Sequence, residues 1–172
     1  VKVGCELARA EQVDFILSIG GGSALDSAKA IAACSQHDCD PWLICSKKVV
    51  PTKAIPVGCI LTLAATGSEM SSSAVITNDE TLIKRGFNSP FNRPLFSIMN
   101  PELTYTLPPY QTACGITDIM AHLFERYFTN TRDVEVTDRV IEGLLMTMIH
   151  EAPKVIADPN DYQARANIMW AG

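Results

Sequence analysis

The spacing of hydrophobic residues along the chain changes near residue 108. Before that point, apolar and β-branched residues form short continuous runs at 13–20 and 57–64, which are typical of buried strands in a parallel sheet. Between the two runs, apolar residues at helical spacing over 24–36 follow a turn of three glycines. The order strand, helix, strand predicts a βαβ unit whose parallel sheet is covered on both faces.

Helical spacing dominates the second part of the chain. Residues 65–109 are rich in Ser, Thr, Asn and Gly, and their alternating pieces SAVITN and LFSIMN are expected to form short strands between loops. The segments that follow indicate helices over 113–128, 133–151 and 162–170. We therefore expect two domains, an α/β domain over 1–107 and an all-helical domain over 108–172.

Both ends of the chain are helical in pattern as well. Residues 1–11 form an amphipathic pattern without a preceding N-cap, and the final ARANIMWAG still has helical spacing. These abrupt ends indicate a piece of a longer chain. On this interpretation the first domain is incomplete at its N-terminus and the second at its C-terminus.

Composition narrows the kinds of partner. The chain has 14 Lys and Arg against 19 Asp and Glu, a net charge of -5, and no basic cluster, which argues against nucleic acid. No apolar run reaches the roughly 18 residues of a membrane helix, so we expect a small-molecule partner and no membrane. Six scattered cysteines without a CxxC pair, and no signal-peptide pattern, indicate reduced, buried thiols in a cytoplasmic protein.

The glycine turn is the first candidate for chemistry. Gly20–Gly22 permit positive φ and a close approach of ligand, and the following helix offers free N–H groups and its positive dipole end to a phosphate. The pattern is not GxGxxG, so the ordinary dinucleotide fingerprint does not apply. A tight turn is an equally strong alternative, with Ser23 as the N-cap and Asp26 closing a box-like cap.

Small hydroxyl residues follow the second predicted strand. Thr62, Thr66 and Ser68 in TLAATGSEMSSS lie at the carboxyl end of a strand, where open α/β sheets bind ligands, and they can hydrogen-bond a cofactor. Composition alone favours a solvated serine-rich loop instead. Lys84, in TLIKRGFNS, can neutralise a phosphate, although a lone lysine is more often a surface charge.

Asp118 and His122, in ITDIMAHLFE, are candidate metal ligands. Residues four apart in a helix share a face, so a carboxylate and an imidazole at this spacing can bind one divalent ion. A catalytic metal generally has three or more protein ligands, and neither His37 nor His150 has an evident reason to face this pair. By spacing alone, a polar pair on the helix surface is the stronger interpretation.

Four segments in this order resemble the iron-containing (group III) alcohol dehydrogenase family. They are VDFILSIGGGSALDSAKAIA, AIPVGCILTLAATGSEMSSSAVI, TYTLPPYQTACGITDIMAHLFERY and the terminal ARANIMWA. They run through nearly the whole chain, and they are most similar to the NADP-dependent butanol dehydrogenase and aldehyde reductase branch. The resemblance implies a Rossmann-like, parallel-sheet dinucleotide-binding domain followed by an all-helical metal-binding domain.

The resemblance also implies roles for individual residues. Those that match the family's pyrophosphate loop are Gly21, Gly22 and Ser23, with Asp26 supporting it. Those that match cofactor-lining positions are Thr62, Thr66 and Ser68 around the nicotinamide and its ribose, and further along Lys84, Leu103 and Thr106. Asp118 and His122 match the first two members of a metal site with one Asp and three His, which binds Fe²⁺ or Zn²⁺.

The activity implied for the longer protein is reversible hydride transfer between a nicotinamide nucleotide, NADP(H) rather than NAD(H), and a primary alcohol or aldehyde. A homodimer is implied as well. The remaining two histidines are expected after residue 172, and the determinant of NAD against NADP before residue 1, so we expect the 172 residues alone to be inactive. The alternatives are an enzyme similar to dehydroquinate synthase or glycerol dehydrogenase, or an inactive nucleotide-binding module.

Overall fold

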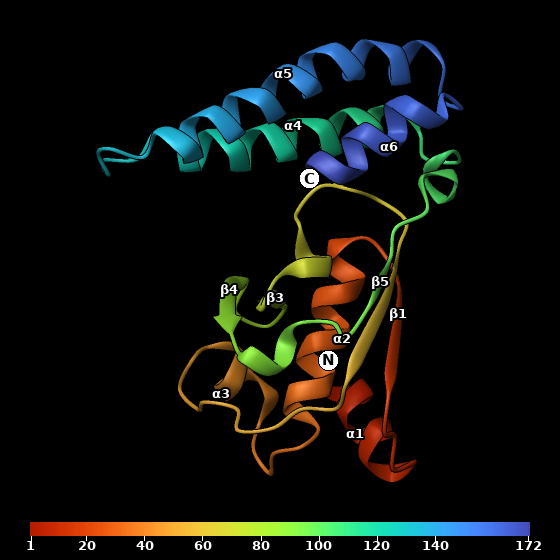
Figure 1. Ribbon diagram of the computed structural model, residues 1–172. Helices are drawn as coiled ribbons and strands as arrows, with labels where there is room; N and C mark the ends of the chain where they lie inside the picture. Colours follow the sequence, from red (N-terminus) through yellow and green to blue (C-terminus); the bar gives the residue numbers. More distant parts are fainter. The chain divides into compact units, whose positions relative to one another are not determined.

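The computed structural model describes all residues, Val1–Gly172, and divides into two compact units. Residues 1–61 and 67–98 form the first, which we call the α/β unit. Residues 62–66 and 99–172 form the second, which we call the helical unit. The chain therefore enters the helical unit twice (Figure 1). The domain limits expected from the sequence stay a prediction.

The α/β unit is built around a parallel sheet. Its helices are α1 (Lys2–Ala10), α2 (Gly22–Cys34) and α3 (Pro41–Cys45), its strands are β1 (Ile16–Gly20), β2 (Val57–Leu61), β3 (Ser73–Asn78), β4 (Ile83–Asn88) and β5 (Ser97–Ile98), and its 3₁₀ turns are η1 (Ser68–Met70) and η2 (Pro90–Asn92). The sheet order is β1-β2-β5, with both neighbouring pairs parallel. The predicted βαβ unit is confirmed, with α2 as the crossover helix.

Helix α2 covers one face of this sheet. Leu25, Ala28 and Ala32 are buried in one cluster with Val57 and Cys59 of β2, because these helix positions fall on one stripe at helical spacing. The sheet and α2 therefore share one core.

The prediction that both faces of the sheet are covered is wrong for these 172 residues. Leu17 and Ile19 alternate with the buried Ser18 along β1 and are 46% and 63% exposed. Successive side chains of a strand point to opposite faces. The face that bears Leu17 and Ile19 is therefore left open by this part of the chain.

Strands β3 and β4 form a separate antiparallel hairpin in the same unit. The sequence predicts β3 as SAVITN, and β5 within LFSIMN is shorter than that segment. It does not predict β4, whose sequence IKRGFN carries two charges and one glycine and has no apolar alternation. Pairing with β3, from Ser73 opposite Asn88 to Asn78 opposite Ile83, is what makes this segment a strand.

The helical unit contains η3 (Pro101–Thr104), α4 (Pro109–Tyr127), α5 (Glu135–Ala157) and α6 (Tyr162–Ala171). Its core joins Ile119 of α4, Met148 of α5 and Ile168 of α6. The three predicted helices are confirmed, but the predicted end of the second at residue 151 is wrong. Helix α5 continues through Pro153, which is exposed, so its ring faces solvent and the missing N–H costs one hydrogen bond.

The cysteines and the helix lengths bear on two expectations. All six cysteines are free thiols, and the four buried ones are Cys5, Cys34, Cys45 and Cys59. Cys39 is half-buried and Cys114 is exposed on α4, so the expectation of uniformly buried thiols is wrong for these two.

None of the helices combines the length and the apolar character that crossing a membrane requires.

Candidate functional site

The glycine turn lies where β1 ends and α2 begins. Gly20 and Leu61, the last residues of β1 and β2, are partners in the parallel register, so the two strands end at the same edge of the sheet. Gly20 has a φ of +155°, and a Cβ built on it would lie 2.7 Å from Cβ of Ala24. The residue must therefore be glycine for the chain to turn directly from β1 into α2.

The first turn of α2 has no side-chain cap. The helix begins at Gly22, its N-cap is Gly21, and no side chain accepts a hydrogen bond from its first N–H groups. The prediction of Ser23 as N-cap with Asp26 closing a box is therefore wrong, because Ser23 already lies inside the helix, where its carbonyl accepts from Oγ of Ser27 at 2.8 Å. The N–H groups and the positive dipole end stay free for an anion.

Asp26 binds the segment that follows β2. One carboxylate oxygen accepts a hydrogen bond from Oγ of Ser68 at 2.7 Å, and the other accepts from the backbone N–H of Val75 at 2.9 Å. Ser68 is 5% exposed, and its hydroxyl also accepts from the Lys29 ammonium at 2.9 Å. The structure thus brings the glycine turn and the ATGSE loop together through Asp26 and Ser68.

Lys29, which the sequence interpretation missed, lies next to Asp26 and Ser68. Its side chain is completely buried, and Nζ donates to the carbonyl oxygens of Ser68, Ser71 and Ser73 at 2.7 to 2.9 Å. Burial lowers the pKa of the Lys29 ammonium, while the carboxylates of Asp26 and Glu69 act in the opposite direction. A signal was present in the sequence, because Lys29 follows Leu25 by four residues and so falls on the buried stripe of α2.

The other predicted cofactor residues lie in solvent-accessible positions. Lys84 is exposed in β4 of the α/β unit. In the helical unit, Thr62 is half-buried, whereas Thr66, Leu103 and Thr106 are exposed. Their contact with a cofactor stays a prediction.

Asp118 and His122 lie one turn apart on α4. Oδ2 of Asp118 and Nε2 of His122 are 3.7 Å apart, and the two side chains are 46% and 43% exposed. Nδ1 of His122 is 3.8 Å from Oε2 of Glu125. No group of three or more His, Cys, Asp or Glu that could hold a metal ion occurs in the chain. The pair has the donor types of a metal site, but two residues are fewer than the three protein ligands that a catalytic metal generally has.

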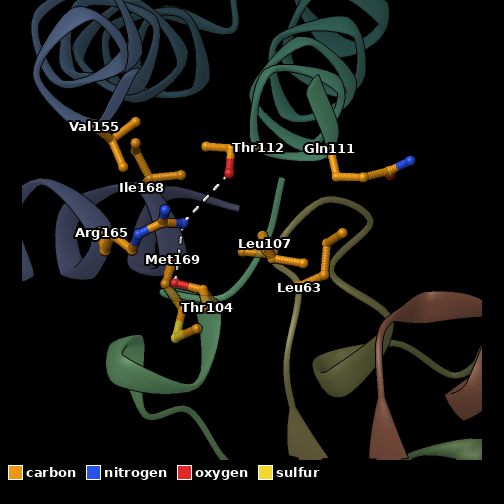
Figure 2. A pocket seen from close by; sticks show the side chains of 10 residues that line it. Leu63, Thr104, Leu107, Gln111, Thr112, Val155, Arg165, Ile168 and Met169 are labelled. Atoms are coloured by element: carbon orange, nitrogen blue, oxygen red, sulfur yellow. Dashed lines mark hydrogen bonds between the residues drawn. The ribbon is translucent and has the colours of Figure 1, made fainter. Parts of the chain in front are cut away.

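Arg165 of α6 organises the start of α4. Its side chain is 5% exposed, Nε donates to the carbonyl of Pro159 at 2.6 Å, and Nη1 donates to the hydroxyls of Thr104 at 3.2 Å and Thr112 at 3.5 Å. Burial lowers the pKa of Arg165. Figure 2 shows the guanidinium reaching towards both threonines. The three residues line a cavity of about 20 Å³, which has room for about one water molecule. The sequence interpretation missed this residue.

Comparisons with known proteins cover the whole chain. Residues 1–101 match the family described as iron-containing alcohol dehydrogenase, and residues 112–172 match the C-terminal family of Fe-containing alcohol dehydrogenases. A probable NADH-dependent butanol dehydrogenase of Bacillus subtilis is 46% identical over 172 residues. The NADPH-dependent aldehyde reductase YqhD of Escherichia coli is 44% identical over 169 residues.

Solved structures give the same result for the fold. The Escherichia coli YqhD structure is similar with a TM-score of 0.96 at 43% identity, over 99% of this chain and 44% of that one. A butanol dehydrogenase structure from Thermotoga maritima has a TM-score of 0.96 at 39% identity, over 99% of this chain and 42% of that one. The match to the Bacillus subtilis relative covers 100% of this chain, and the match to YqhD covers 96%. In both cases the chain spans only 44% of the relative's own length.

Proposed function

Because the chain belongs to the iron-containing alcohol dehydrogenase family, we propose that the protein transfers a hydride between a nicotinamide nucleotide and a primary alcohol or aldehyde. The observation that carries the proposal is the uncapped start of α2 at the carboxyl edge of the parallel sheet, in a chain 46% identical to a butanol dehydrogenase. The alternative similar to dehydroquinate synthase has no comparable support.

The nucleotide binds, on this proposal, along the edge where β1 and β2 end. Gly21, Gly22 and Ser23 offer backbone N–H groups to the pyrophosphate, and the helix dipole favours its negative charge. Asp26 holds the neighbouring loop through Ser68, as its two hydrogen bonds indicate. The further cofactor-lining residues are Thr62, Thr66, Lys84, Leu103 and Thr106, each solvent-accessible and therefore open to a ligand.

The relatives differ in the nicotinamide nucleotide that their names give. Two butanol dehydrogenases of Bacillus subtilis are named as NADH-dependent, whereas YqhD is named as NADPH-dependent. We keep NADP(H) as the predicted cofactor on the resemblance of the motifs. Assembly as a homodimer is likewise a prediction from the family.

Asp118 and His122 would supply two ligands to a divalent metal, Fe²⁺ or Zn²⁺. Carboxylate oxygen and imidazole nitrogen suit both ions, and the separation of 3.7 Å between Oδ2 and Nε2 allows both atoms to face one ion. At least one more protein ligand is needed, and these residues offer none. Held by these residues and further ligands, such a metal would supply Lewis-acid chemistry for the substrate oxygen.

The chain's own residues therefore hold and orient the reactants. The glycine turn and α2 bind the nucleotide phosphates, and the loop fixed by Asp26 borders the nucleotide. On α4, the imidazole of His122 lies 3.7 Å from the Asp118 carboxylate and 3.8 Å from that of Glu125, distances too long for direct hydrogen bonds.

The test uses the protein produced from its complete gene. Oxidation of NADPH and of NADH is followed with butanal as substrate, before and after chelation, and metal content is measured in His122→Ala. His150→Ala is the matched control, because His150 is an exposed histidine on α5 outside the proposed site. We expect His122→Ala to lose both metal and activity, and His150→Ala to keep them.

Two results would overturn the proposal. One is the absence of nucleotide oxidation with any short aldehyde in protein that binds metal fully. The other is full activity and full metal content in His122→Ala. The ratio of kcat/KM for NADPH and NADH decides the cofactor preference separately.

A further inference from the structure

Lys29 has an unusual environment for a lysine. Its side chain is 0% exposed, and Nζ has four oxygen partners within one short segment, namely the carbonyls of Ser68, Ser71 and Ser73 and Oγ of Ser68. No carboxylate lies within ion-pair distance of Nζ among the salt bridges of the chain. The ammonium therefore binds backbone, and it binds the carbonyls of three residues of that segment at once.

The segment that Lys29 binds has little regular structure of its own. Between β2 and β3 it forms only the three-residue turn η1, with backbone bonds from Met70 to Gly67 and from Ser71 to Ser68. Burying an ammonium is costly unless strong acceptors surround it. An apolar side chain at position 29 would avoid that cost, but it would leave the three carbonyls without their common donor.

Asp26 complements Lys29 from one turn earlier in α2. Lys29 binds acceptor groups of the segment, whereas Asp26 binds donor groups, Oγ of Ser68 and the N–H of Val75. Residues three apart lie on the same face of a helix. One face of α2 therefore fixes both ends of the segment from Ser68 to Val75.

We propose that Lys29 is a positioning residue, whose ammonium holds residues 67–73 in the conformation that nicotinamide-nucleotide binding requires. This inference rests on the proposed function, because it takes the start of α2 and the ATGSE loop as two sides of the nucleotide site. Lys29 acts through the loop and does not touch the nucleotide. Its role is to set the loop relative to the helix that binds the phosphates.

The test compares Lys29→Met with Leu25→Ala in the protein produced from its complete gene. Leu25 is a suitable control because it is 1% exposed on the same helix but packs against β2 residues instead of the segment. Three quantities are measured at a temperature where both variants are folded. They are nucleotide affinity by titration, kcat against KM for the nucleotide, and hydrogen exchange of residues 67–75 without nucleotide.

We expect Lys29→Met to weaken nucleotide affinity by roughly tenfold or more, chiefly as a rise in KM, and to raise exchange in 67–75. Leu25→Ala is expected to lower stability while leaving affinity and exchange in 67–75 near those of the unaltered protein. Equal losses of affinity in both variants, or unchanged affinity and exchange in Lys29→Met, would overturn the proposal.

A second variant covers the case in which Lys29→Met does not fold. Asp26→Asn keeps the side-chain volume but weakens the hydrogen bonds to Ser68 and Val75. It should therefore raise both the hydrogen exchange of residues 67–75 and the KM for the nucleotide, as Lys29→Met does. Unchanged exchange and KM in Asp26→Asn would then count against the proposal. If the unaltered protein binds neither NADH nor NADPH, the proposed function fails, while the exchange data still decide whether Lys29 orders the segment.

Discussion

Replacing glycine by alanine should have opposite effects at positions 20 and 143. At Gly20 the added methyl would lie 2.7 Å from Cβ of Ala24, in a backbone conformation with φ of +155°. Cβ of Ala24 is attached to the helix backbone and cannot move alone, so β1 or α2 must shift. A strained conformation of this kind costs roughly 1–3 kcal/mol, so Gly20→Ala should lower the free energy of unfolding by at least that much.

At Gly143 the same methyl meets no atom within 4 Å. The residue lies inside α5, where alanine is favoured over glycine by roughly 0.5–1 kcal/mol because it has less backbone entropy to lose. Gly143→Ala should therefore raise the free energy of unfolding by about that amount. The chemical change is identical in the two variants, and the local space and φ alone set the sign.

Urea unfolding of both variants measures these changes, with hydrogen exchange to report on each unit separately. Nucleotide titration adds a functional reading, because Gly20→Ala moves the turn that leads into α2, whereas Gly143→Ala leaves it alone. We expect weaker nucleotide binding only in Gly20→Ala. The reasoning would be refuted by a shift of the same sign in both variants, or by a Gly20→Ala protein as stable as the unaltered one.

Three further predictions concern stability, pH and activity. Pro153→Ala should raise the free energy of unfolding, measured in urea, by roughly 1–3 kcal/mol, because it restores an N–H inside α5. Its control is Pro109→Ala, at the first position of α4, which should change that free energy little. Burial raises the pKa of the Cys59 thiol above its ordinary 9.0, because the folded protein disfavours the charged thiolate. The neutral thiol therefore contributes fully to stability below pH 9.0, and this contribution is lost as the pH rises through the raised pKa. Cys59→Ala should flatten the alkaline fall in unfolding free energy, and an unchanged slope would contradict this. The purified 172-residue chain should show no aldehyde-dependent oxidation of NADPH, because Asp118 and His122 leave a metal with only two protein ligands; robust activity free of longer protein would contradict it.

The strand and helix order at the start of the chain was predictable because its signals are local. A β-branched run, a glycine turn and a helical stripe each indicate one element without reference to the rest of the chain. The same signals give the parallel pairing of β1 with β2, since a helical crossover requires it. The edge at which the nucleotide is proposed to bind follows from that pairing.

Features that depend on tertiary partners were not predictable in this way. Strand β4 exists because β3 pairs with it, and its own residues have no strand pattern. Ser23 was the N-cap in one of the two interpretations of the turn, but α2 starts two residues earlier because Gly21 serves as its N-cap. Asp26 then binds Ser68 and Val75, which are distant in sequence.

The metal pair shows a different limit. Spacing places Asp118 and His122 on one face of α4, and in the structure Oδ2 of Asp118 lies 3.7 Å from Nε2 of His122. Spacing says nothing of which other residues approach the face, and three-ligand clusters are absent from the chain. The resemblance to a family, carried by motifs throughout the chain, was needed to interpret the pair as ligands.

The two-part composition of the helical unit has a consequence for synthesis on the ribosome. Residues 62–66 belong to this unit, and the carbonyl oxygen of Ala64 would lie 2.6 Å from a Cβ at Gly115, so α4 leaves room for it only because residue 115 is glycine. Ala64 is synthesised roughly 50 residues before Gly115, a delay of several seconds at ordinary translation rates. During that interval residues 67–98 of the α/β unit are synthesised, whereas α4, on which residues 62–66 pack, does not yet exist. Residues 62–66 thus stay unpacked until α4 has been synthesised, and a larger residue at 115, which would clash with the carbonyl of Ala64, would keep them from packing in the finished protein as well.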